Sequence, residues 1–379
     1  MRILIINGPN LNLLGTRDPQ LYGDATLADL EADWRTHCER YDVAIEALQS
    51  NHEGVIVDAI GEGQHRFDAL VINAGALSHY SRSIADAIGA VDLPAVEVHI
   101  SNIYERETWR HVSVLKDVCV LTIVGRGTSG YINAIDHLIA MHTSPARTLQ
   151  YGEENTTVLD LRVPSGDGPH PVAILVHGGF WRTIWTRDLM DPMAAALIGH
   201  GWATANIEYS LGEGSYANAM RDLESAVLWV QSNAAEHDFD PKMVVLVGHS
   251  AGGYLSLAAA ARLPTVAGVV GLAAVTDLEA MSVSRQDDDP VARLLGASLS
   301  DAPRLWHQAG LSGSPTIPIH LVHGSEDDTV DLAQSTNYSQ QTDTIRLTVV
   351  DGCDHMSLID PTSPAWPSVL SAMDLATST

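Results

Sequence analysis

The sequence predicts two consecutive α/β domains, the first of them built on a five-stranded parallel sheet. The chain has 379 residues, which is more than one hydrophobic core usually supports. Short apolar runs alternate with amphipathic stretches along both halves, a pattern typical of parallel sheets covered by helices. The polar, turn-rich stretch TSPARTLQYGEENT separates the halves. We therefore expect one domain over residues 1–142, a linker over 143–150 and a second domain over 151–379.

The elements of the first half follow from their apolar spacing. Continuous apolar runs predict five strands, at Ile3–Ile6, Val43–Leu48, Ala69–Ile72, Ala95–Val98 and Val118–Val124. Helical spacing predicts four helices between them, at Leu27–Tyr41, His52–Gln64, Ser81–Ala90 and Gly130–His142. The stretch GPNLNLLGTRDPQLYG after the first strand is rich in Gly and Pro, which predicts a mobile flap rather than a helix. Five strands fit a doubly wound domain, whose ligands bind beyond the carboxyl ends of the strands.

The second half continues the alternation with more strands. The expected strands are Thr157–Val163, Val172–Val176, Ala203–Ile207, Met243–Val247, Ala267–Leu272, Ile319–Val322 and Leu347–Val349. Helices are expected at Asp188–Gly199, Ala217–Gln231, Ala251–Leu263 and Ala365–Ala376. Because no internal repeat links the halves, they are expected to share a fold class only.

The composition excludes several classes of function. The formal charge is -26, with 10 cations and 19 anions up to His142 and 11 and 28 beyond it, so neither half can present a broad basic face to nucleic acid. The N-terminus lacks a signal-peptide core and no apolar run could span a bilayer, which predicts a cytoplasmic protein without membrane contact. The scattered Cys38, Cys119 and Cys353 indicate neither disulfides nor a metal site, and we expect no cofactor.

Polar side chains of the first half stand where the predicted strands end. Asn10 follows the first strand, Asn73 the third, and His99 the fourth. Arg17 and Tyr22 lie on the flap, where a guanidinium near a phenol can stabilise tyrosinate as a usable base. Because the carboxyl ends of parallel strands converge in space, these residues are predicted to form one site.

These motifs resemble the type II 3-dehydroquinate dehydratases. INGPNLNLLGTRDPQLYG is similar to the opening of that family, and QSNHEG, INAGALSHYS, VEVHISNI, RETWRH and GYINAI follow in the family's order. The resemblance covers about Met1–His142. It implies a flavodoxin-like fold and a homo-oligomer, usually a dodecamer built of trimers.

The resemblance also implies a role for each residue of this site. Tyr22, held as tyrosinate by Arg17, would remove a C2 proton from 3-dehydroquinate, and Asn10 would hold a water that stabilises the enolate. His99, oriented by Glu97, would protonate the departing C1 hydroxyl. The implied substrate-binding residues are Asn73, His79, Ile100, Ser101 and Arg110. The unrelated type I dehydratases use a lysine Schiff base, but Lys116 is the one lysine of this half and lies in no matching motif.

The second half carries the pattern of a serine hydrolase. In VLVGHSAGGYLSLAAAA, Ser250 occupies G-x-S-x-G between a strand and an Ala-rich helix, which is the sequence context of a nucleophile elbow. Asp327 in LVHGSEDDTV and His355 in DGCDHMSLIDP follow later strands, in the order Ser…Asp…His. Asp328 is the alternative acid. The predicted oxyanion-hole residues are Gly178, Gly179 and Ala251.

HGGFWR and GHSAGG resemble the esterase and kynurenine-formamidase-like branch of the α/β-hydrolases. This resemblance implies hydrolysis of an ester or amide without naming the substrate. His177, His249 and His323 are interpreted as structural, and Cys353 as a packing residue. Three tryptophans of this half could either line an aromatic substrate pocket or pack in the core, namely Trp181, Trp185 and Trp202.

The two halves together predict a bifunctional enzyme, a dehydratase fused to a serine hydrolase. Fusion suggests a shared pathway, in which the hydrolase would release quinate or shikimate from acyl esters. Two alternatives remain open. In the first, only one domain is catalytic and the other serves assembly or binding. In the second, the hydrolase is an arylformamidase.

Overall fold

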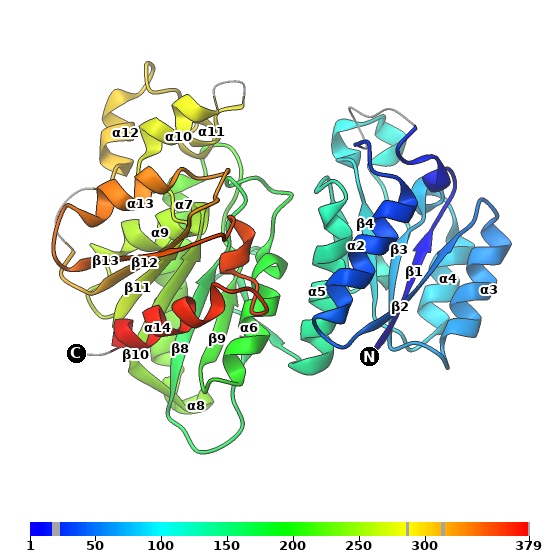
Figure 1. Cartoon of the computed structure of the whole chain (residues 1–379), viewed down its shortest axis with the longest axis horizontal. Coiled ribbons are helices and arrows are strands. Elements are labelled where there is room, and N and C mark those ends of the chain that lie inside the picture. The colour runs from blue at the N-terminus through cyan, green and yellow to red at the C-terminus, as the bar shows by residue number, and fades with distance from the viewer. Residues whose placement is uncertain (17–22, 286–287, 312–314, 378–379) are drawn as a thin grey trace. The chain divides into compact units, whose positions relative to one another are not determined.

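The computed structural model describes residues 1–16, 23–285, 288–311 and 315–377. They form two compact units, Met1–His142 and Thr143–Thr379 (Figure 1). Among the described residues, every helix is too short or too polar to cross a bilayer. Arg17 and Tyr22 lie outside the described residues.

The first unit is built on an all-parallel sheet in the order β2-β1-β3-β4-β5, which confirms the five-stranded parallel sheet predicted from the sequence. Its strands are β1 Arg2–Asn7, β2 Ala44–Gln49, β3 Ala69–Asn73, β4 Ala95–His99 and β5 Leu121–Val124. Its helices are α2 Leu27–Glu39, α3 Glu53–Gly63, α4 Arg82–Ala90 and α5 Ser129–Thr143. Only Leu11–Leu13 of the described flap is helical, as a single 3-10 turn.

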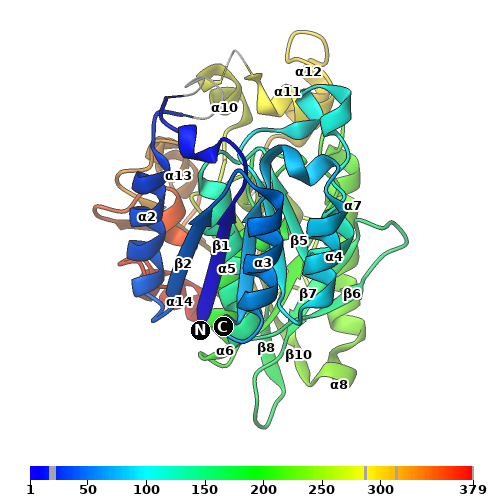
Figure 2. The same ribbon diagram turned by 90° about the vertical axis from the view of Figure 1, so that its right-hand side faces the viewer.

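Alternate residues of the central strands divide the core of the first unit into two layers. Ile3 and Ile5 of β1 pack with α2 and α5, whereas Leu4 and Ile6 pack with α3 and α4. Figure 2 looks onto the face that α3 and α4 cover. Because both faces of the central strands β1 and β3 are buried, these strands, apart from the exposed first residue of β1, are apolar up to their last residues, Asn7 and Asn73.

The second unit is built on an eight-stranded mixed sheet in the order β13-β12-β11-β10-β8-β9-β7-β6. Strand β7 pairs antiparallel with both of its neighbours, β9 and the edge strand β6, and the other neighbours are parallel. The strands are β6 Arg147–Gln150, β7 Val158–Arg162, β8 His170–Val176, β9 Ala203–Ile207, β10 Phe239–His249, β11 Gly268–Leu272, β12 Ile319–Gly324 and β13 Ile345–Val350. This mixed sheet has the α/β-hydrolase arrangement that the sequence predicted.

Helices cover both faces of the second sheet. Residues of α7 and α9 pack on one face, and those of α6 and α14 on the other (Figure 1). The helices are α6 Asp191–Ile198, α7 Tyr216–Ser232, α8 Ala234–His237, α9 Ala251–Ala260, α10 Leu278–Ser284, α11 Pro290–Leu295, α12 Pro303–Ala309, α13 Leu332–Ser339 and α14 Trp366–Thr377.

One segment differs from its sequence-based prediction. Residues 143–150, expected as a linker, contain the end of α5 and the strand β6, whose residues pair with β7 from Arg147↔Leu161 to Gln150↔Val158. β6 is mostly exposed. An edge strand of this kind is stabilised by backbone hydrogen bonds, so it needs no apolar pattern that sequence analysis could detect.

Two candidate active sites

A cavity of about 130 Å³ opens at the carboxyl ends of the strands of the first unit. Seven residues predicted from the sequence line it, namely Asn10, Asn73, His79, His99, Ile100, Ser101 and Arg110. Glu97 is fully buried in β4, two residues before His99. The structure thus brings together every predicted residue of this site that it describes, while the proposed base Tyr22 and its partner Arg17 fall outside the described residues.

Close backbone packing shapes the wall of this cavity. A Cβ added to Gly8 would clash with the Ala74 backbone, so only glycine lets the segment after β1 pass the end of β3. Asn10 then takes a left-handed conformation (φ 68°), and its backbone N–H donates to Asn51 Oδ1 at 2.9 Å. Asn51 belongs to the QSNHEG motif, which therefore supports the Asn10 segment from the neighbouring strand.

The buried Glu97 carboxylate orients the His99 ring. His99 Nε2 donates to Glu97 Oε1 at 2.9 Å, and the Ser113 hydroxyl donates to the same oxygen at 2.6 Å. Burial would raise the pKa of Glu97, but the hydrogen bonds from His99 and Ser113 outweigh it and hold the pKa below its ordinary value. Glu97 is therefore ionised, and Nδ1 is the His99 nitrogen left to exchange a proton with a ligand.

His79 lines the cavity, and one of its ring nitrogens is held by the backbone. Its Nδ1 donates to the Val112 carbonyl at 2.9 Å, and its ring lies 5.9 Å from that of His99 between centroids. Burial lowers the pKa of His79, which favours the neutral ring. A neutral His79 can accept a hydrogen bond from a hydroxyl of a bound ligand.

Among the described residues, Arg106 and Arg110 border the cavity, and sequence analysis identified only Arg110. Arg110 donates to Glu107 at 2.8 Å, and its guanidinium lies 4.0 Å from the centroid of the Trp109 ring. Arg106 also lines the cavity and donates to the Ser101 hydroxyl at 3.2 Å. Both arginines stand in the RETWRH motif, and their spacing of four residues is the signal that could have identified Arg106. They supply positive charge for an anionic ligand in an acidic protein.

Ser250 of the second unit sits on a strained turn between β10 and α9. Its backbone has φ 54° and ψ -117°, and the residue is 2% exposed. An added Cβ at Gly252 would clash with the Val176 and His177 carbonyl oxygens, and one at Gly248 would clash with the Gly252 carbonyl. The flanking glycines of G-x-S-x-G therefore let α9 approach β8 closely, as a nucleophile elbow requires.

Asp327 and His355 form a hydrogen-bonded pair in the segments after β12 and β13. His355 Nδ1 donates to Asp327 Oδ2 at 2.7 Å, while the Thr329 and Val330 backbone N–H groups donate to Oδ1 at 2.9 and 2.8 Å. Burial would raise the pKa of Asp327, but the hydrogen bonds from His323 and His355 lower it far below its ordinary range. The ionised Asp327 holds the His355 tautomer that leaves Nε2 unprotonated.

His249 links the elbow to His355. It directly precedes Ser250, its Nε2 donates to the His355 carbonyl at 3.1 Å, and the two rings lie 4.6 Å apart between centroids. Complete burial, followed by the proximity of His355, lowers the pKa of His249 to about 3, so the ring stays neutral. A buried, neutral ring hydrogen-bonded to the His355 backbone is consistent with the structural role that the sequence suggested for His249.

The HGGFW segment after β8 approaches Ser250 through its backbone. A Cβ at Gly178 would come within 2.9 Å of the Ser250 Cβ, and Gly179 has φ 111°. The preceding His177 is fully buried, and its Nε2 donates to Glu208 Oε1 at 2.9 Å. Glu208, which sequence analysis did not identify, thereby anchors the segment that brings Gly178 beside the elbow.

Two of the three tryptophan candidates of the second unit, and its thiol candidate, are buried in the core. Trp181 is fully buried and meets the Tyr254 ring edge to face at 5.7 Å, and Trp202 is 4% exposed within the core. Trp185 packs against the same core as Trp202 from a partly buried position. Cys353 is 1% exposed in that core, and burial, followed by Asp354 and Glu326, raises the pKa of its thiol. These placements favour the core interpretation over an aromatic substrate pocket.

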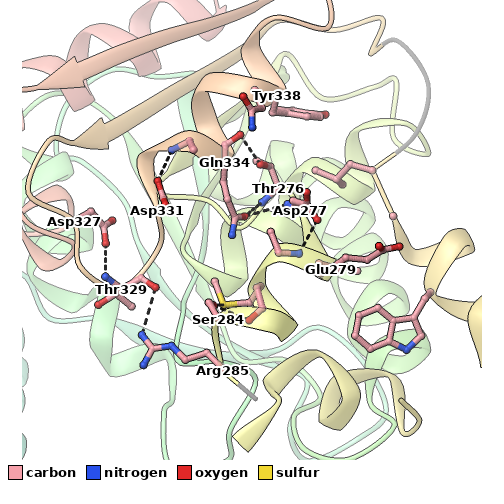
Figure 3. A pocket seen from close by; sticks show the side chains of 18 of the residues that line it. Thr276, Asp277, Glu279, Ser284, Arg285, Asp327, Thr329, Asp331, Gln334 and Tyr338 are labelled. Carbon is pink, nitrogen blue, oxygen red and sulfur yellow. Dashed lines mark hydrogen bonds between the residues drawn. The ribbon is translucent and has the colours of Figure 1, made fainter. Parts of the chain in front are cut away.

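A larger cavity of about 890 Å³ lies beside Asp327 in the second unit (Figure 3). It is enclosed by the segments after β11 and β12 and by α13. Gln334 of α13 accepts from the Thr276 and Asp277 backbone N–H groups at 2.8 and 3.1 Å and so joins these walls. Of the predicted triad, Asp327 lines this cavity, whereas Ser250 and His355 are not among its described lining residues. Nowhere in the described parts of the chain do three or more His, Cys, Asp or Glu side chains gather as metal ligands would.

Comparisons with known proteins identify the first unit. A family model described as dehydroquinase class II matches residues 1–139. A catabolic 3-dehydroquinase of Verticillium alfalfae is 55% identical over 135 residues, which are 36% of this chain and 90% of that protein. The chain belongs to the class II dehydroquinase family. A 3-dehydroquinate dehydratase of Bacillus pumilus is 49% identical to the dehydroquinase unit over 137 residues, covering 36% of this chain and 93% of that protein.

The second unit resembles esterases. A family model described as BD-FAE matches residues 159–342. The solved structure of a bacterial heroin esterase is similar at a TM-score of 0.53 and 20% identity, covering 66% of this chain and 92% of that one. The dehydroquinase unit is therefore fused to an esterase-like α/β-hydrolase unit.

Proposed function

We propose that the dehydroquinase unit converts 3-dehydroquinate to 3-dehydroshikimate. The observation that carries this proposal is the ionised Glu97 holding His99 at a cavity bordered by Arg106 and Arg110. The names of the relatives, catabolic 3-dehydroquinase among them, support the same substrate and a role in quinate breakdown. The test is to assay the purified full chain with 3-dehydroquinate, where an absence of dehydration would refute the proposal.

Each step of this dehydration needs one kind of group. Tyr22, with Arg17 stabilising its phenolate, removes the proton at C2, which lies next to the ketone. The negative charge moves onto the ketone oxygen, where a water held by Asn10 stabilises the enolate. Hydroxide is a poor leaving group, so His99 delivers a proton from Nδ1 to the C1 hydroxyl as the C–O bond breaks. Asn73, His79 and the segment of Ile100 and Ser101 bind the substrate hydroxyls and carboxylate.

Replacing Ser113 with alanine is expected to shift the acid side of the dehydratase pH profile upward. The Ser113 hydroxyl stabilises the Glu97 carboxylate, so its loss raises the pKa of Glu97. Activity should then decline at a pH about one unit higher than in the wild type, given the worth of a hydrogen bond to a charged group. Thr122→Val, which removes a longer 3.3 Å hydrogen bond to Glu97, is the matched control and should shift the profile less. An unmoved profile in Ser113→Ala would contradict this role of Glu97.

We further propose that the α/β-hydrolase unit hydrolyses an ester or amide through Ser250, His355 and Asp327. The strained turn at Ser250 and the His355–Asp327 hydrogen bond support this proposal. His355 Nε2 takes the Ser250 proton as the hydroxyl attacks the carbonyl carbon, and the same proton then passes to the leaving group. Backbone N–H groups of Gly178, Gly179 and Ala251 stabilise the tetrahedral oxyanion, and water attack on the acyl-enzyme completes the cycle.

An ester substrate has more support than a formamide. The BD-FAE match and the esterase neighbour favour an ester, and Trp181 and Trp202 are packed in the core instead of lining an aromatic pocket. Assays with simple aryl esters, acyl quinates and N-formylkynurenine separate the possibilities. Equal activity on simple aryl esters and acyl quinates would refute a substrate shared with the dehydroquinase unit. Turnover of N-formylkynurenine that vanishes in Ser250→Ala would instead establish an arylformamidase.

The depressed pKa of Asp327 predicts that acid destabilises the α/β-hydrolase unit. Aspartate in an unfolded chain titrates near ~3.9. Because the folded pKa is lower, the stabilisation is fully present above about pH 4 and is lost as the pH falls toward the folded pKa. Asp327→Asn should lower the melting temperature of this unit at neutral pH, and its difference from the wild type should shrink below about pH 4. Thermal unfolding across this range measures the effect, and a constant difference would contradict it.

A further inference from the structure

A chain of three polar side chains lies buried behind the cavity of the dehydroquinase unit. Asn73 Nδ2 donates to the Tyr131 hydroxyl at 2.9 Å, and that hydroxyl donates to Asn7 Oδ1 at 2.6 Å. Asn7 and Asn73 end β1 and β3 and are partners in register, whereas Tyr131 comes from the first turn of α5. We propose that Tyr131 is a positioning residue, which fixes the Asn73 amide for substrate through this chain.

The direction of these hydrogen bonds is determined by the backbone. The Gly75 N–H donates to Asn73 Oδ1 at 3.2 Å, so the oxygen of the amide must face Gly75 and its nitrogen must face Tyr131. The Tyr131 hydroxyl has one proton, and because it accepts from Asn73, that proton goes to Asn7. The second hydrogen on Asn73 Nδ2 and the second lone pair on Oδ1 are the groups that remain for a ligand in the cavity.

Packing holds the Tyr131 ring in place. Tyr131 and Trp34 are both fully buried, and their rings stack at 4.5 Å between centroids with 29° between planes. Burial raises the pKa of Tyr131 well above its ordinary value, outweighing the hydrogen bond from Asn73, so the hydroxyl keeps its proton. Tyr131 is therefore a rigid, permanently protonated partner for a side chain that lines the cavity.

The functional consequence rests on the proposed dehydration, in which Asn73 binds a substrate hydroxyl. Removing the Tyr131 hydroxyl leaves the buried Asn73 Nδ2 without its partner, so that the longer hydrogen bond from the Gly75 N–H alone holds the amide less firmly. The proton transfers at Tyr22 and His99 do not involve this chain. Loss of the hydroxyl therefore weakens substrate binding more than it slows the chemical steps.

A double-mutant cycle on the full chain tests this role. The variants Tyr131→Phe, Asn73→Ala and the double variant are assayed for kcat and KM with 3-dehydroquinate. Tyr131→Phe alone should lower kcat/KM by about fivefold to tenfold, mainly through KM, which is the scale of one hydrogen bond. In the Asn73→Ala background, Tyr131→Phe should lower kcat/KM by less than about twofold, because the Asn73 amide that Tyr131 positions is already absent.

Tyr41→Phe is the matched control, since it removes a tyrosine hydroxyl of the same unit at a residue outside this chain and outside the cavity lining, and its kcat/KM should stay within about twofold of the wild type. A loss from Tyr131→Phe that is equal in both backgrounds, or falls on kcat alone, would overturn the proposal. If Asn73→Ala has wild-type kcat/KM, the substrate role of Asn73 fails, and the proposal fails with it. Should Tyr131→Phe not fold, Asn7→Ala enters the same cycle with the same expected outcome.

Discussion

Ser250→Ala is expected to abolish ester hydrolysis by the full chain and to leave dehydration of 3-dehydroquinate unchanged. Without the hydroxyl, His355 has no nucleophile to activate, and only the oxyanion hole and substrate binding remain. The kcat for the ester should fall by about 10⁴-fold to 10⁶-fold, as in other enzymes that lose a catalytic serine. Steady-state assays with an aryl ester measure this loss.

Ser256→Ala is the matched control for Ser250. Ser256 lies in α9 close to the elbow, is fully buried, and donates to the Gly252 carbonyl at 2.9 Å. Its loss removes a buried hydroxyl of the same kind without removing the proposed nucleophile, so ester hydrolysis should persist. A fluorophosphonate probe should label the wild type and the Ser256 variant but not the Ser250 variant. Failure to label wild-type Ser250 would indicate a non-catalytic binding module.

His99→Asn is expected to remove most of the dehydratase activity and to leave ester hydrolysis intact. Asparagine keeps a polar side chain beside Glu97 but cannot transfer a proton to the departing C1 hydroxyl. The loss in kcat should be about 10²-fold to 10⁴-fold, the usual contribution of a general acid. Initial rates with 3-dehydroquinate measure the loss.

The control for His99 is His65→Asn, at an exposed position away from the cavity. It should dehydrate 3-dehydroquinate like the wild type. If His99→Asn also kept wild-type activity, the Glu97–His99 pair would not be the acid, and the second half of the proposed mechanism would be wrong.

The residues that sequence analysis predicted are those that local context specifies. Ser250 is marked by a strand, a glycine-flanked turn and an Ala-rich helix, all contiguous in sequence. Asn73 and His99 are the last residues of buried parallel strands, where a polar residue after an apolar run indicates a strand end. Neither type of signal depends on knowing the tertiary structure.

Apart from Arg106, the residues that sequence analysis missed act through partners that are distant in sequence. Ser113 reaches Glu97 across 16 residues of sequence, and Tyr131 reaches Asn73 across 58. Glu208 supports His177 from the next strand, 31 residues away. Each looks like an ordinary polar residue until the fold brings it beside its partner.

Some elements were missed for a different reason. The helices α10, α11 and α12 have only six or seven residues each, which is too short for a helical period to show in the sequence. Of these, α10 and α12 line the cavity beside Asp327 together with α13. The shape of this cavity therefore could not be predicted from the sequence, although the candidate nucleophile Ser250 could.

We infer that one chain carries two independent active sites. The most direct test is a crossed assay of the wild type, Tyr22→Phe, His99→Asn and Ser250→Ala on 3-dehydroquinate and on an ester. The wild type should act on both substrates. Tyr22→Phe and His99→Asn should lose only dehydration, and Ser250→Ala should lose only hydrolysis. A wild type inactive on either substrate, or any of these substitutions abolishing both activities, would contradict the claim.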